Sequence, residues 1–236
     1  MVPTFFIGRK LERETKNWLI QNAVDFEEHS LIHIEFVQPE TEKLVEQKKY
    51  QTQFVVSSKW GAKWLVQNLS KVNFSGSDQV FCLSEKQKEI LKLATKNVFV
   101  SKMKNSASLV KLVMEKNTSE TVVFLHGNKT QDSTSSKLNA AGIRFLNLEV
   151  YKNSLLKNKI NRNFNVYLFF SPSGVESFIG GGNSVLPDSK IVAIGKTTAT
   201  FCRQYFQNKI YISEIQEELA VTQYAVELNK DFEIKS

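Results

Sequence analysis

Two short segments in the C-terminal third of the chain combine apolar, small and hydroxyl residues in a way that could bind anions. Phe169–Val175 reads Phe-Phe-Ser-Pro-Ser-Gly-Val, and Ile191–Ala199 reads Ile-Val-Ala-Ile-Gly-Lys-Thr-Thr-Ala. Each is an apolar run that stops at small or hydroxyl residues and continues into a helical pattern. The N-terminus of a helix carries unpaired N–H groups and the positive end of the helix dipole, which attract carboxylates and phosphates. Two such turns predict an anion-binding crevice at the carboxyl ends of parallel strands.

The rest of the chain alternates between short apolar runs and segments with a helical pattern. The runs predicted to be strands are 4–8, 31–36, 53–57, 79–83, 97–101, 121–125, 143–149, 166–170, 190–194 and 209–212. Short, continuously apolar strands separated by helices are typical of parallel sheets that helices cover on both faces. The sequence therefore predicts an α/β fold.

Four pairs of segments repeat at a nearly constant spacing. Ser58 and Gly61 match Ser171 and Gly174, each 113 positions later in the sequence. The matching pairs are 32–35 with 146–149, 56–62 with 169–175, 80–84 with 191–195, and 98–101 with 210–213. A period this long indicates two similar domains rather than a solenoid.

The composition favours a folded protein with a basic surface. The formal net charge is +7, and the lysines are spread along the chain without a basic tract, which is usual for a solvated surface. The alternative is attraction for an acidic partner; a small polycarboxylate fits this charge, and no motif favours nucleic acid. No apolar run is long enough to cross a membrane, and Met1–Arg9 lacks the order of a signal peptide, which predicts a cytoplasmic protein. Cys82 and Cys202 are interpreted as buried thiols. The histidines lack metal-ligand spacing, so we expect no metal, and we expect no cofactor either. We expect a monomer because no predicted helix is apolar all round.

The two anion-binding turns resemble the signature segments of the uroporphyrinogen-III synthase family. Phe169–Val175 corresponds to F-[FT]-S-P-S-G-[VL], and Ala193–Ala199 corresponds to A-I-G-x-T-T-A. The resemblance is specific in the C-terminal third and looser elsewhere. It implies two similar α/β domains, each a parallel sheet flanked by helices, joined by a two-stranded hinge. The implied limits are 1–37 plus 164–236 for domain 1, 50–151 for domain 2, and 38–49 and 152–163 for the linkers.

In domain 1 the resemblance implies that six residues of the two turns bind substrate: Ser171, Ser173, Gly174, Lys196, Thr197 and Thr198. Serine and threonine also cap helices, so an ordinary structural role would explain the same residue types. Lys196 stands where the family commonly has proline, and it is either a carboxylate partner or an exposed side chain. Arg9 follows the first predicted strand and either binds a substrate carboxylate or forms a structural ion pair.

In domain 2 the resemblance is weaker. Ser58 and Gly61 occupy the equivalent of the Ser171 turn, without the proline that family members usually carry there. Gly127 and Asn128 resemble a family turn that follows another strand, and both are expected to contact substrate. Tyr151 resembles the tyrosine favoured for assisting departure of the substrate hydroxyl, which makes it the expected catalytic residue. A tyrosine at a strand end is otherwise usually half-buried packing, and that alternative stays open. The segment 84–87 lacks the glycine and threonine of the family turn, so binding is not carried over to it.

The activity that the resemblance implies is that of a lyase in tetrapyrrole and heme biosynthesis. The enzyme would convert hydroxymethylbilane to uroporphyrinogen III with loss of water and inversion of ring D, in the cleft between the domains. Hydroxymethylbilane synthase would be the upstream donor of the substrate. Two other classes stay open. One is a non-catalytic two-domain binder of an acidic tetrapyrrole or other polyanion. The other is a phosphate- or nucleotide-binding protein, although the usual glycine-rich phosphate motifs are absent.

Overall fold

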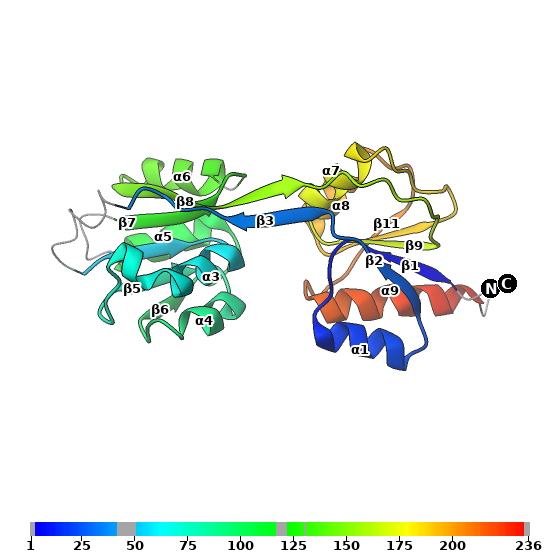
Figure 1. Ribbon diagram of the computed structural model, residues 1–236, viewed down its shortest axis with the longest axis horizontal. Coiled ribbons are helices and arrows are strands. Elements are labelled where there is room, and N and C mark those ends of the chain that lie inside the picture. The colour runs from blue at the N-terminus through cyan, green and yellow to red at the C-terminus, as the bar shows by residue number, and fades with distance from the viewer. Residues whose placement is uncertain (1–2, 42–50, 117–121, 130, 234–236) are drawn as a thin grey trace. The chain divides into compact units, whose positions relative to one another are not determined.

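The computed structural model describes residues 3–41, 51–116, 122–129 and 131–233, which form two compact units. Unit 1 comprises Met1–His33 and Ser154–Ser236, and unit 2 comprises Ile34–Asn153. Both units are α/β, with parallel strands flanked by helices (Figure 1). The α/β fold predicted from the sequence is therefore confirmed.

Unit 1 is built on a five-stranded sheet with the order β11-β10-β9-β1-β2, and every neighbouring pair in it is parallel. Its middle strand, β9, is buried along its whole length, as expected for a sheet that is covered on both faces. The strands are β1 (Thr4–Ile7), β2 (Asp25–Glu28), β9 (Val166–Phe169), β10 (Lys190–Ala193) and β11 (Ile210–Ile212).

Two helices pack on each face of the unit 1 sheet. Val175 and Phe178 of α7 (Pro172–Gly180) share a buried cluster with Cys202 of α8 (Lys196–Cys202). On the opposite face, Leu19 of α1 (Arg13–Gln21) shares a cluster with residues of α9 (Glu218–Glu233). Figure 1 shows α7 and α8 on one side of this sheet and α1 and α9 on the other.

Unit 2 is built on a six-stranded sheet with the order β3-β8-β7-β4-β5-β6. The strands are β3 (Ile32–Phe36), β4 (Gln53–Val56), β5 (Gln79–Cys82), β6 (Val98–Val100), β7 (Val122–Gly127) and β8 (Phe145–Leu155). The five strands from β8 to β6 are parallel. β3 runs antiparallel to β8, because Val37 N–H donates to Val150 while Leu156 N–H donates to Leu31, both at 3.1 Å.

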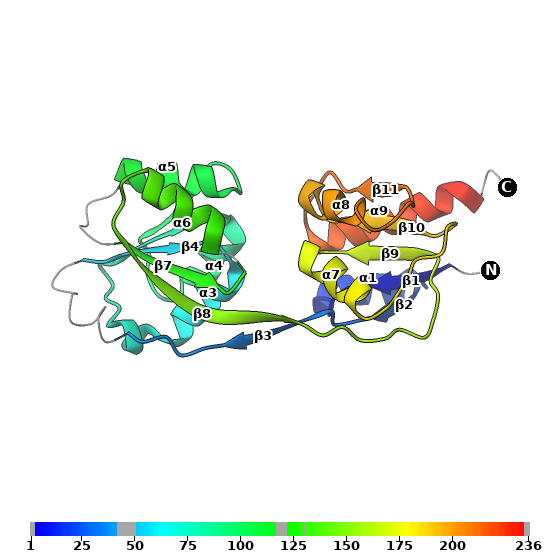
Figure 2. The same ribbon diagram turned by 90° about the horizontal axis from the view of Figure 1, so that it is seen from above.

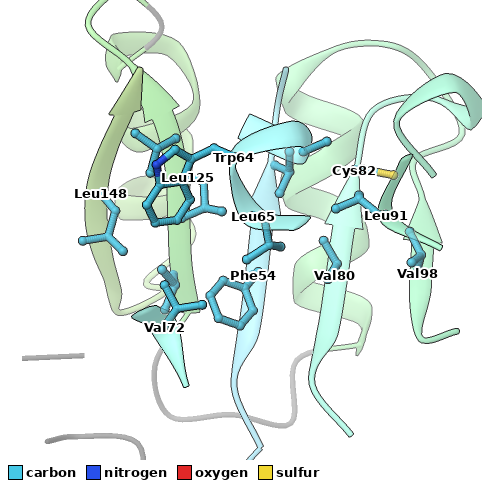
Figure 3. Packing of buried hydrophobic residues seen from close by; sticks show 14 of the residues in the cluster. Phe54, Trp64, Leu65, Val72, Val80, Cys82, Leu91, Val98, Leu125 and Leu148 are labelled. Carbon is cyan, nitrogen blue, oxygen red and sulfur yellow. The ribbon is translucent and has the colours of Figure 1, made fainter. Parts of the chain in front are cut away.

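The helices of unit 2 also cover both faces of their sheet. α3 (Lys59–Gln67), the 3-10 helix η1 (Leu69–Val72) and α4 (Glu85–Leu91) pack on one face, whereas α5 (Ser106–Lys116) and α6 (Gln131–Ala140) pack on the other. Figure 3 shows Trp64 and Leu65 of α3 lying over the strands that carry Phe54 and Leu125. These side chains have no exposed surface, so this contact anchors α3 rigidly to β4 and β7.

The chain crosses between the units in β3 and β8, which lie side by side in both views (Figures 1 and 2). The crossings fall at His33/Ile34 and Asn153/Ser154. In this division the first crossing lies inside β3, whose continuation pairs with β8, and the linker expected at 38–49 stays a prediction. Residues 42–49 of that expected linker lie outside the described residues. The domain limits expected from the sequence stay a prediction.

Two details differ from the sequence-based expectations. β2 was not predicted, because Asp-Phe-Glu-Glu is polar; it forms the edge of its sheet, where charged side chains reach water. The match of 32–35 with 146–149 does not relate equivalent strands. β3 is an antiparallel connecting strand, whereas β8 follows β7 as β2 follows β1, each parallel to its predecessor.

Candidate functional site

Each sheet has one place where the chain leaves two neighbouring strands in opposite directions. In unit 1 this switch point lies between β1 and β9, since β1 leads to β2 on one side and β9 leads to β10 on the other. In unit 2 it lies between β4 and β7. Ligands of open α/β sheets bind outside the carboxyl ends of the strands at such points.

Serine caps stand at both switch points. Ser171 Oγ accepts a hydrogen bond from the Gly174 N–H at 3.1 Å, and Ser58 Oγ accepts one from the Gly61 N–H at 3.0 Å. The expected binding residues of these two turns therefore have the helix-capping role as well. Pro172 has no N–H, and the Gly174 N–H is already bonded to Ser171. In the first turn of α7, the groups that remain for a ligand are therefore the backbone N–H and the hydroxyl of Ser173, which is partly exposed.

The N-terminus of α8 is the third expected binding turn. Lys196 and Thr197 are exposed, whereas Thr198 is only 3% exposed. The cap position is Gly195, and a Cβ there would lie 2.9 Å from both Cδ and Nε2 of Gln216. The Gln216 side chain, which sequence reasoning did not single out, thus lies against the start of α8.

The expected binding helices differ from α4, which was left out of the site, in whether their first turn contains an acidic residue. α3, α7 and α8 have no acidic residue in the first turn, so the positive end of each dipole has no acidic side chain beside it there. α4 begins at the Ser84 cap but carries Glu85 in its first turn. This carboxylate opposes anion binding and agrees with leaving 84–87 out of the site.

Arg9 lies at the carboxyl end of β1, where it makes an ion pair. Its Nε is 3.1 Å from Oε2 of Glu218 and 3.2 Å from the Lys10 carbonyl oxygen. Its guanidinium carbon lies 5.3 Å from the centre of the Phe170 ring, at the end of β9. The structural ion pair is therefore present, and the side chain is still 30% exposed beside the switch point.

In unit 2, Gly127 and Tyr151 lie opposite each other on β7 and β8, next to a register shift in the pairing. A Cβ at Gly127 would lie 2.3 Å from Cε2 of Tyr151, so only glycine leaves room for the ring. Tyr151 is 5% exposed and belongs to the core of unit 2. Asn128 Oδ1 accepts from the Asn153 N–H at 2.9 Å, which fastens this turn to β8.

The cysteines and one histidine have structural surroundings. Burial raises the pKa of Cys82 to about 11 and that of Cys202 to about 12, so both thiols stay protonated at neutral pH. His126 is buried, with Nδ1 at 3.2 Å from the Gly127 carbonyl oxygen. Among the described residues, no group of three His, Cys, Asp or Glu side chains could hold a metal ion. In the same part of the chain, no helix combines the length and apolarity needed to cross a membrane.

The expected residues thus form two sets, one at the carboxyl edge of each sheet. The unit 1 set is Arg9, Ser171, Ser173, Gly174, Lys196, Thr197 and Thr198, and the unit 2 set is Ser58, Gly61, Gly127, Asn128 and Tyr151. Sequence reasoning quoted Phe170 only as part of the signature segment and did not single out Gln216 or Glu218. The available signal for Gln216 and Glu218 was that residues 213–218 directly follow an apolar strand. Such residues lie at the same sheet edge as the other expected site residues, because parallel strands have their carboxyl ends at one edge.

Comparison with known proteins places this fold and these turns in a family. The crystal structure of uroporphyrinogen-III synthetase from Helicobacter pylori has a TM-score of 0.67 at 16% identity, covering 97% of this chain and 100% of that one. A mutant uroporphyrinogen III synthase from the extremely thermophilic bacterium Thermus thermophilus has a TM-score of 0.65 at 17% identity, covering 98% and 100%. At such identities the likeness shows the fold. No significant match was found among curated proteins. The sequence matches the family described as uroporphyrinogen-III synthase HemD over residues 18–223, so the chain belongs to the uroporphyrinogen-III synthase family.

Proposed function

We propose that this protein is a uroporphyrinogen-III synthase, a lyase that cyclises hydroxymethylbilane with loss of water and inversion of ring D. The observation that carries the proposal is a repeated one. α3 and α7 each begin at a switch point with a serine cap and no acidic residue in the first turn. A linear tetrapyrrole with eight carboxylates suits a protein that offers anion-binding turns on two sheets and a net charge of +7.

Binding in this proposal relies on backbone N–H groups, hydroxyls and a few cations. Ser171, Ser173 and Gly174 bind through the start of α7, and Lys196, Thr197 and Thr198 through the start of α8. Ser58, Gly61, Gly127 and Asn128 contribute from unit 2, and Arg9 binds a carboxylate beside β1. The proposed location is the cleft expected between the two domains. Such groups orient a flexible substrate and stabilise charge without a catalytic triad.

The proposed chemistry begins when the hydroxyl of the substrate leaves as water. The phenol of Tyr151 donates the proton that this departure needs. The pyrrole nitrogen stabilises the azafulvene cation that remains. Attack through the substituted carbon of ring D gives a spiro intermediate, which fragments and recloses with ring D inverted. This last closure releases one proton, which restores the phenol. Spontaneous closure gives the type I isomer instead, so the essential task of the protein is to hold ring D in the productive orientation.

Hydroxymethylbilane synthase would supply the substrate, and we expect the protein to work as a cytoplasmic monomer. The test is product analysis: hydroxymethylbilane is generated in the presence of the protein, and the oxidised porphyrins are separated into type I and type III. Type III as the main product supports the enzyme.

One observation favours a second candidate, a non-catalytic binder of an acidic tetrapyrrole. Glu85 stands in the first turn of α4, a helix of unit 2 whose N-terminus would otherwise attract an anion. The carboxylate of Glu85 repels an acidic ligand there. This candidate predicts that the folded protein binds uroporphyrin without changing the proportion of type I product.

A further inference from the structure

The loop that follows β1 is held by two carboxylates from other elements of unit 1, one 17 and one 206 positions from the N–H that it accepts from. Glu218, at the start of α9, accepts a hydrogen bond from the Glu12 N–H through Oε1 at 2.7 Å. Glu28, at the end of β2, accepts one from the Leu11 N–H, also at 2.7 Å. Both side chains are nearly buried, with exposed fractions of 7% for Glu218 and 10% for Glu28.

The two carboxylates differ in what their second oxygen does. Oε2 of Glu28 pairs with the Lys16 ammonium at 2.6 Å, whereas Oε2 of Glu218 lies 3.1 Å from Nε of Arg9. Since Oε1 of Glu218 is fixed by the backbone of Glu12, the carboxylate cannot rotate freely. It therefore fixes a negative charge beside Nε of Arg9, whose one hydrogen is donated to the Lys10 carbonyl oxygen.

Arg9 is held from a second direction by an aromatic ring. Its guanidinium lies over Phe170, the residue that directly precedes the Ser171 cap. Arginine stacks on aromatic faces and presents its donors in a rigid planar fork. Nε lies beside Glu218 and donates its hydrogen to the Lys10 carbonyl oxygen, so the edge made by the two terminal NH2 groups is the one proposed to meet a ligand. That edge is the one that binds a carboxylate with two parallel hydrogen bonds.

We propose that Glu218 is a positioning residue, which holds Arg9 over Phe170 so that its terminal edge binds a carboxylate of the tetrapyrrole. The inference rests on the proposed function and adds a residue to it. A purely structural ion pair would make Glu218 and Glu28 equivalent, because both fasten the same loop. A positioning role makes only Glu218 matter for the ligand, and only while Arg9 is present.

The test uses the full chain and two readouts. Dissociation constants for uroporphyrin III, a porphyrin with eight carboxylates, are measured by fluorescence, and KM for hydroxymethylbilane is measured in the isomer assay. The variants are Glu218→Gln, Arg9→Ala, the double variant, and Glu28→Gln as the matched control. Thermal unfolding of each variant reports the structural cost separately.

We expect Glu218→Gln and Arg9→Ala each to weaken uroporphyrin binding and raise KM about tenfold, as for a lost hydrogen bond to a charged group. The double variant should be no worse than Arg9→Ala alone. Glu28→Gln should lower the melting temperature but leave binding within about twofold of wild type.

Equal effects of Glu218→Gln and Glu28→Gln on binding would overturn the inference, as would multiplied effects in the double variant. A wild-type protein that binds uroporphyrin but forms only type I product would refute the enzyme while leaving the positioning role measurable by binding. A wild type that does neither would overturn both.

Discussion

The ring of Tyr151 lies directly over the α-carbon of Gly127. A Cβ at position 127 would be 2.3 Å from Cε2 and 2.4 Å from Cζ of that ring. The two residues face each other across β7 and β8, where the pairing shifts register between His126 and Gly127. The absence of a side chain at Gly127 thus sets the position of the Tyr151 ring, one strand away from the switch point between β4 and β7.

The first prediction concerns this contact. Gly127→Ala should displace the Tyr151 ring, lower kcat at least tenfold, and cost about 1–3 kcal/mol of stability through overpacking. Gly76→Ala is the matched control in the same unit, because a Cβ there would have no atom within 4 Å. Steady-state kinetics and urea unfolding measure the two effects. Unchanged kcat in a folded Gly127→Ala protein would separate the ring position from catalysis.

The second prediction removes only the hydroxyl of Tyr151. Tyr151→Phe keeps the ring that packs in the core and should lower kcat about 100-fold, the usual scale for loss of a proton donor. KM should stay within about twofold, since binding is assigned to the surrounding turns. A variant with wild-type kcat would show that another group assists departure of the hydroxyl.

The third prediction compares three serine caps. Ser58→Ala and Ser171→Ala should each cost about 1 kcal/mol of stability and raise KM, because both caps shape proposed anion-binding turns. Ser84→Ala should reduce stability, but its KM should not change, since Glu85 occupies that turn. An equal rise of KM in all three variants would mean that capping acts only through general stability.

The fourth prediction concerns the thiols. Burial raises the pKa of Cys82 to about 11 and that of Cys202 to about 12, so neither forms a thiolate at about pH 8. A thiol reagent such as dithionitrobenzoate should leave both cysteines of the native protein unmodified, and should label both in guanidinium chloride. Rapid labelling of the native protein at either cysteine would contradict the burial of that side chain.

The fifth prediction follows from the pKa of Glu28. Burial raises this pKa, but hydrogen bonds from Lys16 and the Leu11 N–H lower it more, so the net shift is below the usual 4.5. A lowered pKa in the folded state adds stability above about pH 4.5, and this is lost as the pH falls through the folded-state value. Glu28→Gln should therefore lower the urea midpoint at neutral pH, with a gap that narrows at about pH 3. A gap that is constant with pH would contradict this.

The sequence was sufficient for the fold class, because strands such as β4 and β9 are buried at every position and almost entirely apolar. It was insufficient for β2, whose polar residues suit a sheet edge. It also could not show that β3 is antiparallel, because the direction of a strand in a sheet depends on the path of the connecting chain and not on the residues of the strand. The matching offset of 32–35 and 146–149 was therefore misleading.

The serine caps could be read from local sequence because a cap and its helix are adjacent. Glu218 could not be assigned to Arg9 in the same way. The two residues meet only when α9 packs beside α1 on one face of the sheet, and Glu12, which shares that carboxylate, lies 206 positions before Glu218. Side-chain partners of this kind follow from topology rather than from local pattern.

Isomer analysis of the product tests the central claim most directly. Hydroxymethylbilane is generated at a fixed rate with increasing amounts of the protein, and the porphyrins are separated by chromatography after oxidation. The proposed function predicts that the type III fraction rises with protein concentration until type III is the main product. Type I product at every concentration, from protein shown by circular dichroism to be folded, would contradict it.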